Sequence, residues 1–422
     1  MTASAPIAMT DLKIRVLPGL SGIPAAEWDA CANPEVEGEL PEVSDQELKV
    51  FDENDCGLRG HLYNPFISYD FLYALEASHS AVTRTGWRAQ HLVAEDAQGR
   101  ILGAVPCYLK SHSQGEYVFD HGWADAYERA GGSYYPKLQV CVPFTPATGA
   151  RLLARPGPAA QPVKHALASA LIALCDQREA SSVHATFLPE HEWRLLAAQG
   201  FLQRTDQQFH FENNGYSTFE DFLSALSSRK RKLIRRERRE ALPEGVTVHC
   251  LTGTDLTEEI WDAFFAFYME TGSRKWGRPY LTRAFFSLIG QSMPERVLLI
   301  MAKRAGRWIA GAINFIGSET LFGRHWGAIE HHPFLHFEVC YYQAIEYAIA
   351  HGLKRVEAGA QGEHKLARGY VPVTTYSAHY VADPGLRRAI ADYLKRERAH
   401  VAAAGEELAA YAPFRKDMAG EE

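Results

Sequence analysis

Long apolar runs, paired cysteines and a leader segment are all absent from this sequence of 422 residues. No stretch approaches the roughly eighteen uninterrupted apolar residues that a membrane-spanning helix needs. The seven cysteines are scattered without a CxxC pair, which favours free thiols in a reducing compartment over disulfides or a thiolate metal site. The N-terminal MTASAPIAMTDLKIRV lacks the charged and apolar segments of a secretory signal. We therefore expect a cytoplasmic protein without a transmembrane segment.

An excess of positive charge is also missing, since the net charge is −7 and the isoelectric point is near 6.2. This balance argues against a dedicated nucleic-acid binder, although it leaves room for a local basic patch. Hydrophobic residues make up 46% of the chain and charged residues 23%, which is typical of a globular protein. The length predicts two or three domains.

The predicted helices and strands follow one order twice along the chain. AQGRILGAV at 97–105 resembles AGRWIAGAI at 305–313 with one gap. We predict an α+β fold of two units, each a mixed, mostly antiparallel sheet flanked by helices, with 80–213 and 245–385 as two separate copies. The expected divisions are an N-terminal segment with an acidic insertion (1–60), a first unit (61–213), a second unit beginning with a basic helix (214–403) and a loose tail (404–422).

Three local patterns predict where individual elements begin. Ser68 is placed to cap a helix within 64–81. Glu116–Trp123 continues the strand pattern of the first half. Ser217 and Glu220 have the spacing of a capping box at the start of a helix.

A charged, glycine-rich loop follows the short predicted strand that begins at Arg355. Gly359 and Gly362 allow a sharp turn, and an acid, an imidazole and cations crowd the next positions. At the end of a strand in a mixed sheet, such a loop favours a functional site over an exposed loop with incidental charges. The polar residues of this loop are Gln361, Glu363, His364, Lys365 and Arg368.

A set of short motifs runs through both halves from about residue 60 to residue 400. They are NPFIS (64–68), TGW (85–87), the run 110–138, PFTPATGARLL (143–153), SRKRKLIRRERRE (228–240), WGRPYL (276–281), GRHWG (323–327), LHFEVCYYQAIEYAI (335–349) and GAQGEHKLARG (359–369). The order of elements resembles a tandem of the acyltransferase unit called GNAT. The motifs resemble more narrowly the FemAB-like family, described in bacteria as peptidoglycan biosynthesis or recognition proteins.

This resemblance implies acyl transfer. Better understood Fem relatives move an amino acid from aminoacyl-tRNA onto the peptide of a cell-wall precursor, so we expect an acyl- or aminoacyltransferase acting on such a precursor or a related small acceptor. One alternative is an N-acyltransferase that uses CoA or a carrier thioester on a small amine. Another is a catalytically silent tandem that binds peptidoglycan precursor or RNA.

One departure from the GNAT pattern concerns the acyl donor. GNAT acetyltransferases hold the CoA pyrophosphate on a glycine-rich loop at a helix N-terminus. The corresponding segments here, AIEHHPFLHFEV in the second half and LLARPGPAAQP in the first, lack that glycine spacing. Acetyl-CoA is therefore disfavoured, and the missing loop suits an aminoacyl-tRNA donor better.

The resemblance also implies where the reaction takes place. The GNAT site lies where the fourth and fifth strands splay apart, here between GRHWGAIE and RVEAG, so the segment beginning at His336 and the charged loop should face each other. Acyl transfer to an amine needs a base and positive charge near the developing oxyanion. The candidate catalytic residues are Glu338, His364, Lys365, His336 and Glu363. Candidate substrate-binding residues in this half are Gln361, Arg368, Arg324 and Trp326.

The histidines near this region also raise the question of a metal. His332 and His336 are four residues apart, but Pro333 lies between them and argues against a shared helix. We therefore predict no metal site. The alternative is that these imidazoles, together with His325, His331 and His364, hydrogen-bond loop backbone.

Two further groups carry binding hypotheses. Aromatic residues mixed with charges between 120 and 137 suit a pocket for a polar substrate, or equally an aromatic strand with a polar edge; they are Asp120, His121, Trp123, Asp125, Tyr134, Tyr135 and Lys137. The basic run at 229–239 could bind tRNA phosphates or an anionic membrane surface, or could be a solvated helix neutralised by carboxylates. Its candidate polyanion-binding residues are Arg231, Lys232, Arg235 and Arg236.

Overall fold

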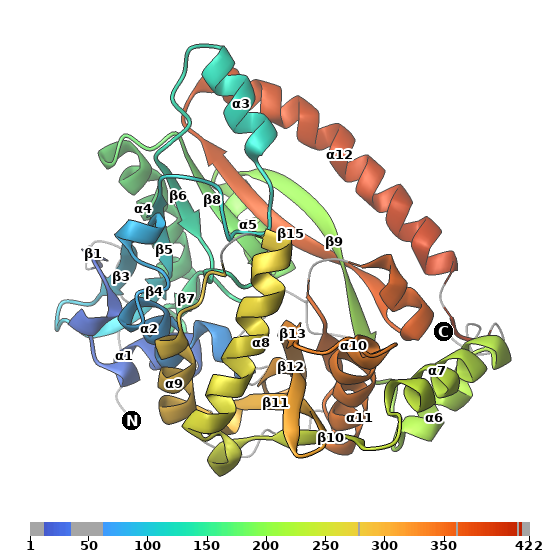
Figure 1. Cartoon of the computed structure of the whole chain (residues 1–422). Helices are drawn as coiled ribbons and strands as arrows, with labels where there is room; N and C mark the ends of the chain where they lie inside the picture. Colours follow the sequence, from blue (N-terminus) through green and yellow to red (C-terminus); the bar gives the residue numbers. More distant parts are fainter. Residues whose placement is uncertain (1–11, 35–61, 277–278, 360–361, 412, 416–422) are drawn as a thin grey trace.

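A computed structural model describes residues 12–34, 62–276, 279–359, 362–411 and 413–415. Two sheets organise these residues, with helices packed on their faces (Figure 1). The smaller sheet is antiparallel and is covered by α1 (Ala25–Ala32) and α4 (Ala160–Gln177). Its strands, in order, are β1 (Lys13–Leu17), β3 (His91–Glu95), β4 (Ile101–Val105) and β7 (Leu153–Ala154).

Within the described residues, the larger sheet has eleven strands and contains residues of both halves of the chain. Only two of its neighbouring pairs among the described residues are parallel, β13 with β14 and β6 with β8. The order is β10 (Val246–Leu251), β11 (Val297–Arg304), β12 (Arg307–Ile316), β13 (Thr320–Ala328), β14 (Arg355–Glu357), β9 (Leu202–Glu212), β15 (Val371–Val381), β8 (Ser182–Leu188), β6 (Lys137–Val140), β5 (Cys107–Lys110) and β2 (Trp87–Ala89).

The predicted α+β class, with mixed and mostly antiparallel sheets flanked by helices, is confirmed. The expectation of two separate sheets is wrong. The last long strand of each half pairs inside the other half: β15 lies between β8 and β9, and β9 lies between β14 and β15. The two halves are joined because β9 and β15 hydrogen-bond to each other from Val371 to His379.

The second half of the large sheet is buried on both faces. Along β11, Val297, Leu299 and Met301 pack in the core beneath α8 (Glu258–Trp276) and α9 (Arg283–Ser292). The alternating residues Leu298 and Ile300 belong to the core on the opposite face, as a strand buried on both sides requires. That face is covered by α6 (Phe219–Ala225), α7 (Ser228–Ala241), α10 (Leu335–Phe337) and α11 (Gln343–Ala350), with a π-helical turn at Glu338–Tyr342.

The remaining helices flank the centre and the first half. Helix α12 (Pro384–Ala410) runs along β9 and β15 (Figure 1). Helix α2 (Tyr69–Ala77) is capped, as predicted, by Ser68, whose hydroxyl accepts from the Phe71 amide at 3.3 Å. None of the helices in the part of the chain that the structure describes is both long and apolar enough to cross a membrane. The other two helices are α3 (His121–Arg129) and α5 (Glu190–Ala198).

Three local predictions are corrected. Glu116–Trp123 is not a strand but a loop leading into α3, because the Glu116 and Asp120 side chains turn inward to Lys137. The capping box at the start of α6 is formed by Thr218 and Asp221, one residue later than predicted. Helix α12 extends into the predicted loose tail as far as Ala410, and residues 412 and 416–422 of that tail lie outside the described residues.

Candidate active site

Strands β13 and β14 diverge after a short parallel contact. Residues 320–322 pair with 355–357, and β13 then continues to Ala328 beside β12. Ile313 pairs with His325 and Asn314 pairs with Gly323, so Arg324 is the extra residue of a β-bulge. Bulges often re-aim a side chain next to a functional site. Here the bulge lies where the two strands separate.

Glu357 ends β14 at this divergence. Its side chain is buried, with 5% of the residue exposed, and its Oε2 has no hydrogen-bond partner. Burial raises the pKa of Glu357 to about 7, while the charges of Arg355 and Arg324 act in the opposite direction. A carboxyl that changes protonation near neutral pH is suited to general acid–base work.

Arg324 and His210 complete the polar surroundings of this carboxyl. The Arg324 guanidinium donates to the main-chain carbonyl of Phe144, and its carbon lies 5.9 Å from the ring centroid of Tyr117; both residues belong to the first half. His210 pairs with Glu357 across β9 and β14. Burial lowers the pKa of His210 to about 3, and its Nδ1 has no partner. The neutral imidazole therefore adds no positive charge beside Glu357, on which Arg324, Arg355 and the buried Arg151 act.

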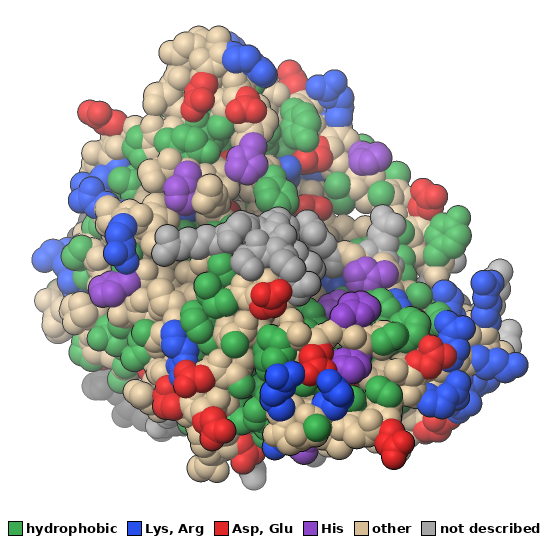
Figure 2. Space-filling model, viewed as in Figure 1, with side chains coloured by type: hydrophobic (Ala, Val, Ile, Leu, Met, Phe, Trp, Pro, Cys, Tyr) green, Lys and Arg blue, Asp and Glu red, His purple; other side chains and the backbone are tan. Residues whose placement is uncertain are grey.

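A cavity of about 480 Å³ lies at the far end of β13. This volume is within the range of small-molecule sites. Histidine side chains gather on this face of the molecule (Figure 2), and the lining residues that the structure describes include neither lysine nor arginine. The lining residues are Glu270, Thr271, Trp326, Ala328, Ile329, Glu330, His331, His332, Phe334, Leu335, His336 and Phe337.

The charged loop faces the segment beginning at His336, as the sequence predicts. The Tyr341 hydroxyl and His364 Nε2 are 2.9 Å apart, and the Arg368 guanidinium carbon lies 3.4 Å from the Phe337 ring centroid. His364 is exposed, whereas Lys365 is buried and donates to the Gly359 carbonyl at 2.9 Å. Burial lowers the pKa of Lys365 to about 8.

Several predicted site residues have other roles or lie outside the described part. Glu338 is fully buried and accepts from Arg238 of α7 and from Gln343, so its carboxylate is already held. Arg368 donates to Glu237 of α7 and to the His364 carbonyl. The Glu338 carboxylate and the Arg368 guanidinium are therefore engaged inside the fold, whereas the sequence suggests a catalytic role for the first and substrate binding for the second. Gln361 and the side chain of Glu363 lie outside what the structure describes.

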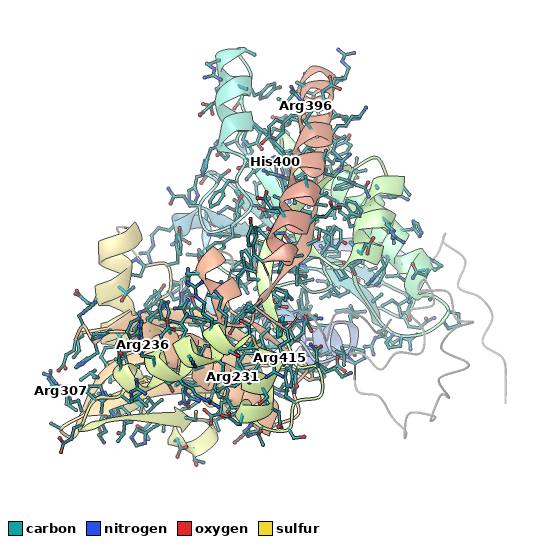
Figure 3. All side chains as sticks on the ribbon, turned by 90° about the vertical axis from the view of Figure 1, so that its right-hand side faces the viewer. Arg231, Arg236, Arg307, Arg396, His400 and Arg415 are labelled. Atoms are coloured by element: carbon teal, nitrogen blue, oxygen red, sulfur yellow. The ribbon has the colours of Figure 1, made fainter. Side chains whose placement is uncertain are left out.

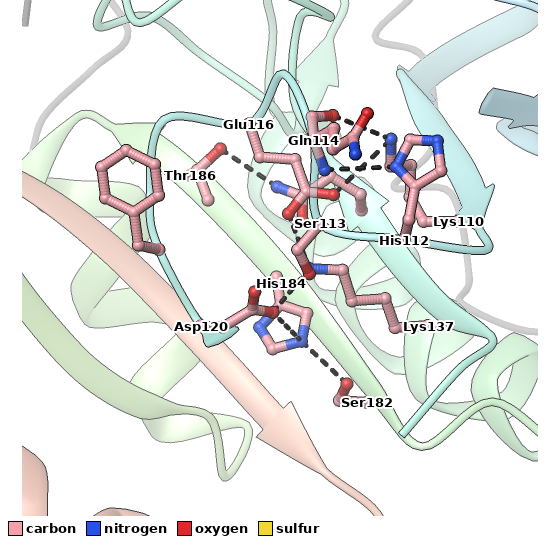
Figure 4. A network of polar contacts seen from close by, with 12 residues as sticks. Lys110, His112, Ser113, Gln114, Glu116, Asp120, Lys137, Ser182, His184 and Thr186 are labelled. Carbon is pink, nitrogen blue, oxygen red and sulfur yellow. Dashed lines mark hydrogen bonds and ion pairs between the residues drawn. The ribbon is translucent and has the colours of Figure 1, made fainter. Parts of the chain in front are cut away.

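Part of the first-half cluster forms a buried ion network (Figure 4), and the other members lie around it. Lys137 donates to Glu116 at 2.6 Å and to Asp120 at 2.5 Å, and the Tyr134 hydroxyl donates to Asp120 at 2.7 Å. Burial alone would raise the pKa of Asp120, but Lys137 and His184 hold it well below its ordinary value. These charges therefore compensate one another inside the fold.

The other members of that cluster surround the network. Trp123 is buried against His379, with ring centroids 5.0 Å apart, and Tyr135 shares a hydrogen bond with Ser113. His121 and Asp125 lie on the exposed side of α3. The predicted substrate pocket in this stretch thus contains an internal salt-bridge network, and only its outer residues face solvent.

The basic run forms helix α7 as predicted, on the face seen in Figure 3. Arg238 is tied to Glu338 and Glu346, and Arg235 pairs with Glu220. Arg236 and Glu240 are 3.6 Å apart on the exposed surface. Carboxylates therefore neutralise part of the helix, and the outer cations remain accessible.

No group of three or more His, Cys, Asp or Glu side chains within the described ranges is arranged to hold a metal ion. His332 instead pairs with Glu330 at 3.0 Å, and the His336 ring packs edge-on against Trp326. Glu330 is further held by Arg304 and Arg307.

Sequence reasoning missed Glu357 and the bulge at Arg324. A signal for the first was present, because RVEAG places an acidic residue between the apolar Val356 and Ala358 at the predicted divergence. The contact with Phe144 had no such signal, since it joins segments from different halves of the chain.

Fold and site together define an α+β protein with a buried titratable carboxyl and a guanidinium where two parallel strands separate. The chain belongs to the FemAB-like family, whose profile, described as peptidoglycan biosynthesis/recognition, matches residues 19–416. No curated protein matches the sequence.

Solved structures with a similar arrangement share little sequence with this chain. The FemX crystal structure is 12% identical, with a TM-score of 0.49 over 83% of this chain and 98% of that one. A tandem GNAT protein from the clavulanic acid biosynthesis pathway is 13% identical, with a TM-score of 0.43 over 89% and 99%. L-PGS from Bacillus licheniformis is 11% identical, with a TM-score of 0.45 over 85% and 99%.

Proposed function

We propose that this protein is an acyltransferase of the FemAB-like type that transfers an acyl or aminoacyl group to an amine of a cell-wall precursor or a related small acceptor. The observation that carries this proposal is the buried Glu357 carboxyl, on which the charge of Arg324 acts, at the point where β13 and β14 diverge. The family description, peptidoglycan biosynthesis/recognition, supports the same substrate class.

The chemistry needs one proton acceptor and one site of positive charge. In the proposed step, the acceptor amine attacks the acyl carbonyl and gives its proton to the Glu357 carboxylate. The Arg324 guanidinium stabilises the negative charge that develops on the carbonyl oxygen. The bond from the acyl carbon to the leaving oxygen of the donor then breaks, and that oxygen departs with a proton from Glu357.

The cavity at the end of β13 supplies a place for the acyl part of the donor. Its walls combine Trp326, Phe334 and Phe337 with Glu270 and Glu330. Glu330 is already paired with Arg304, Arg307 and His332, so the aromatic faces are what favour a neutral group or an ammonium. A pyrophosphate would require cations or a glycine-rich helix N-terminus. An aminoacyl donor therefore suits this cavity better than acetyl-CoA.

Purification from the native host followed by native mass spectrometry would identify a bound donor or acceptor. Transfer of radiolabelled amino acid from aminoacyl-tRNA to an amine acceptor should occur with the wild type and be lost with Glu357→Gln. Micromolar binding of acetyl-CoA, about −8 kcal/mol, would favour the CoA-dependent alternative. Tight binding of precursor or RNA without any transfer would favour a silent binding protein.

A further inference from the structure

A loop of the first half, Pro143–Arg151, lies against the proposed site in the second half. We call these residues the crossing loop. Its Phe144 carbonyl accepts from Arg324, and its Pro146 carbonyl accepts from the Gln208 side chain of β9 at 2.9 Å. The Thr148 amide lies close enough to Glu357 to favour the charged carboxylate. Three backbone groups of one loop thus reach three strands of the larger sheet, β13, β9 and β14.

Arg151 anchors the crossing loop from within. Its side chain is almost fully buried, with 1% of the residue exposed. Nη1 donates to the carbonyls of Gly149 at 2.9 Å and Ala150 at 3.1 Å, and Nη2 donates to the carbonyl of Ala147 at 2.9 Å. Three carbonyls on one planar guanidinium fix the curvature of the loop, which the three rotatable donors of a lysine ammonium could not reproduce.

Glu192 of α5 holds the end of the loop. Its Oε2 accepts from the backbone amides of Arg151 at 2.8 Å and Leu152 at 3.2 Å, and Lys164 is bound to its other oxygen. Glu192 is fully buried. A buried carboxylate with several donors is a strong anchor because charge-assisted hydrogen bonds are stronger than neutral ones.

The backbone around the crossing loop is strained. Phe144 and Phe187 have φ values of 59° and 57°, in the left-handed region that bulky residues rarely adopt. Such strain costs about 1–3 kcal/mol per residue and tends to be retained at functional sites. Phe144 also stacks on Tyr280, with ring centroids 4.7 Å apart.

The same loop occupies the corresponding divergence in the first half. It leaves β6 where β6 and β8 separate, and the Gly149 amide donates to the Phe187 carbonyl near the end of β8 at 3.0 Å. The first half therefore fills its own divergence with a segment that reaches the divergence of the second half.

We propose that Arg151 is a positioning residue, which shapes the crossing loop so that the first half holds Arg324 and Glu357 in place for the reaction of the second half. The catalytic part of this inference rests on the proposed function. The geometric part does not, because it concerns only how the loop places two side chains.

The experiment compares Arg151→Lys and Arg151→Met with the wild type. Arg155→Lys serves as the matched control, since Arg155 binds Glu27 and the Ile101 carbonyl away from the loop. The carboxyl ¹³C signal of Glu357, assigned by its absence in Glu357→Gln, is followed against pH. Amide hydrogen exchange is measured across residues 143–150, and melting temperatures are recorded in parallel.

We expect both Arg151 variants to raise the pKa of Glu357 by about half a pH unit or more, because the Thr148 amide and Arg324 are no longer held against it. Arg151→Met also removes a charge that acts on Glu357 directly, so Arg151→Lys, which keeps that charge, is the variant that tests positioning. Exchange across the crossing loop should become faster, and Arg155→Lys should change neither. The groups that face Glu357 and remain in every variant are Arg355, Arg324, Glu212 and His210. With an identified substrate, kcat should fall about 100-fold, as expected for a small misplacement of reacting groups.

Other outcomes would overturn the inference. A wild-type pKa in Arg151→Lys would mean that only the charge at 151 matters. A lower melting temperature with unchanged Glu357 titration would mean a purely structural role. If Arg151→Met does not fold, Glu192→Gln loosens the same loop and should produce the same two changes in weaker form. Absence of transferase activity in the wild type, with the expected titration and exchange, would refute the proposed function and leave the positioning role intact.

Discussion

Arg238 of α7 donates to both carboxylate oxygens of Glu338, at distances of 2.9 to 3.2 Å. Glu338 begins the π-helical turn that follows the cavity-lining segment, and Arg238 also binds Glu346 at 2.7 Å. The basic helix is therefore tied to the segment that lines the proposed donor cavity. Glu338, which the resemblance suggests as a catalytic base, thus anchors the contact between α7 and this segment.

Glu338→Ala should destabilise the protein. Removing one partner of a buried ion pair leaves a poorly compensated charge, and we expect a loss of about 2–4 kcal/mol in the free energy of unfolding. Glu346→Ala is the matched control, because its side chain is 46% exposed and such pairs contribute about 0–1 kcal/mol. Urea denaturation measures both. A Glu338 variant with unchanged stability and abolished turnover would instead support the catalytic role.

Glu357→Gln should remove activity and the pH dependence of the reaction together. As a base with a pKa of about 7, Glu357 gives a rate that rises with pH, is half-maximal at about that pKa and levels off above it. Loss of a positioned acid–base group typically costs about two to four orders of magnitude. A pH profile of kcat/KM is the measurement. A wild-type profile in the variant would show that another group takes the proton.

The same substitution should make the protein more stable at alkaline pH. The ordinary pKa of this carboxyl is 4.5 and its folded value is about 7, so the folded state binds more protons between these two values. Stability is therefore lost as pH rises from about 4.5 and levels off above about 7. Glu357→Gln should match the wild type near pH 4 and exceed it by about 1–3 kcal/mol at pH 8. Equal stability at both pH values would contradict the buried, raised carboxyl.

The sequence predicts well what depends on local pattern. The α+β class follows from the repeated order of helices and strands, and Ser68 follows from the chemistry of helix caps. Joining of the two halves could not be predicted in this way, because β9 and β15 pair across a long separation in the chain. Strand periodicity indicates that a strand exists and does not specify its neighbour.

In the candidate site, too, local pattern predicts some features, whereas others depend on tertiary structure. The many charged residues of the loop after β14 predict a site there, and the predicted contact of this loop with the segment that begins at His336 is confirmed. Glu357 is distinguished by burial, which is a tertiary property and raises its pKa only once the sheets have formed. The sequence suggests Glu338 as a catalytic residue because it does not reveal the ion pair with Arg238, which lies on a different helix.

His364 and Lys365 should respond differently to alanine substitution. His364 is exposed, so His364→Ala should change the free energy of unfolding by about half a kcal/mol or less. Lys365 is 1% exposed and holds the Gly359 carbonyl. Lys365→Ala should therefore cost about 1–3 kcal/mol through the lost bond and packing. Thermal and urea unfolding test this difference, and equal effects would contradict the burial of Lys365.

Replacing Arg231, Lys232, Arg235 and Arg236 by Gln should weaken binding of polyanions if α7 is the docking face for a tRNA donor. Exposed pairs such as Arg235 with Glu220 contribute little, so these cations remain available to phosphates. Each lost phosphate contact should lower the slope of log K against log salt by about 0.7–0.9. A matched control removes four exposed cations of the first half, Lys13, Arg84, Arg88 and Arg129, with the same change in net charge. Binding of tRNA and of anionic liposomes is measured at several salt concentrations.

Loss of tRNA binding alone would favour the donor role, and loss of liposome binding alone would favour a membrane surface. Equal losses in the variant and the control would mean that only the net charge of the protein matters.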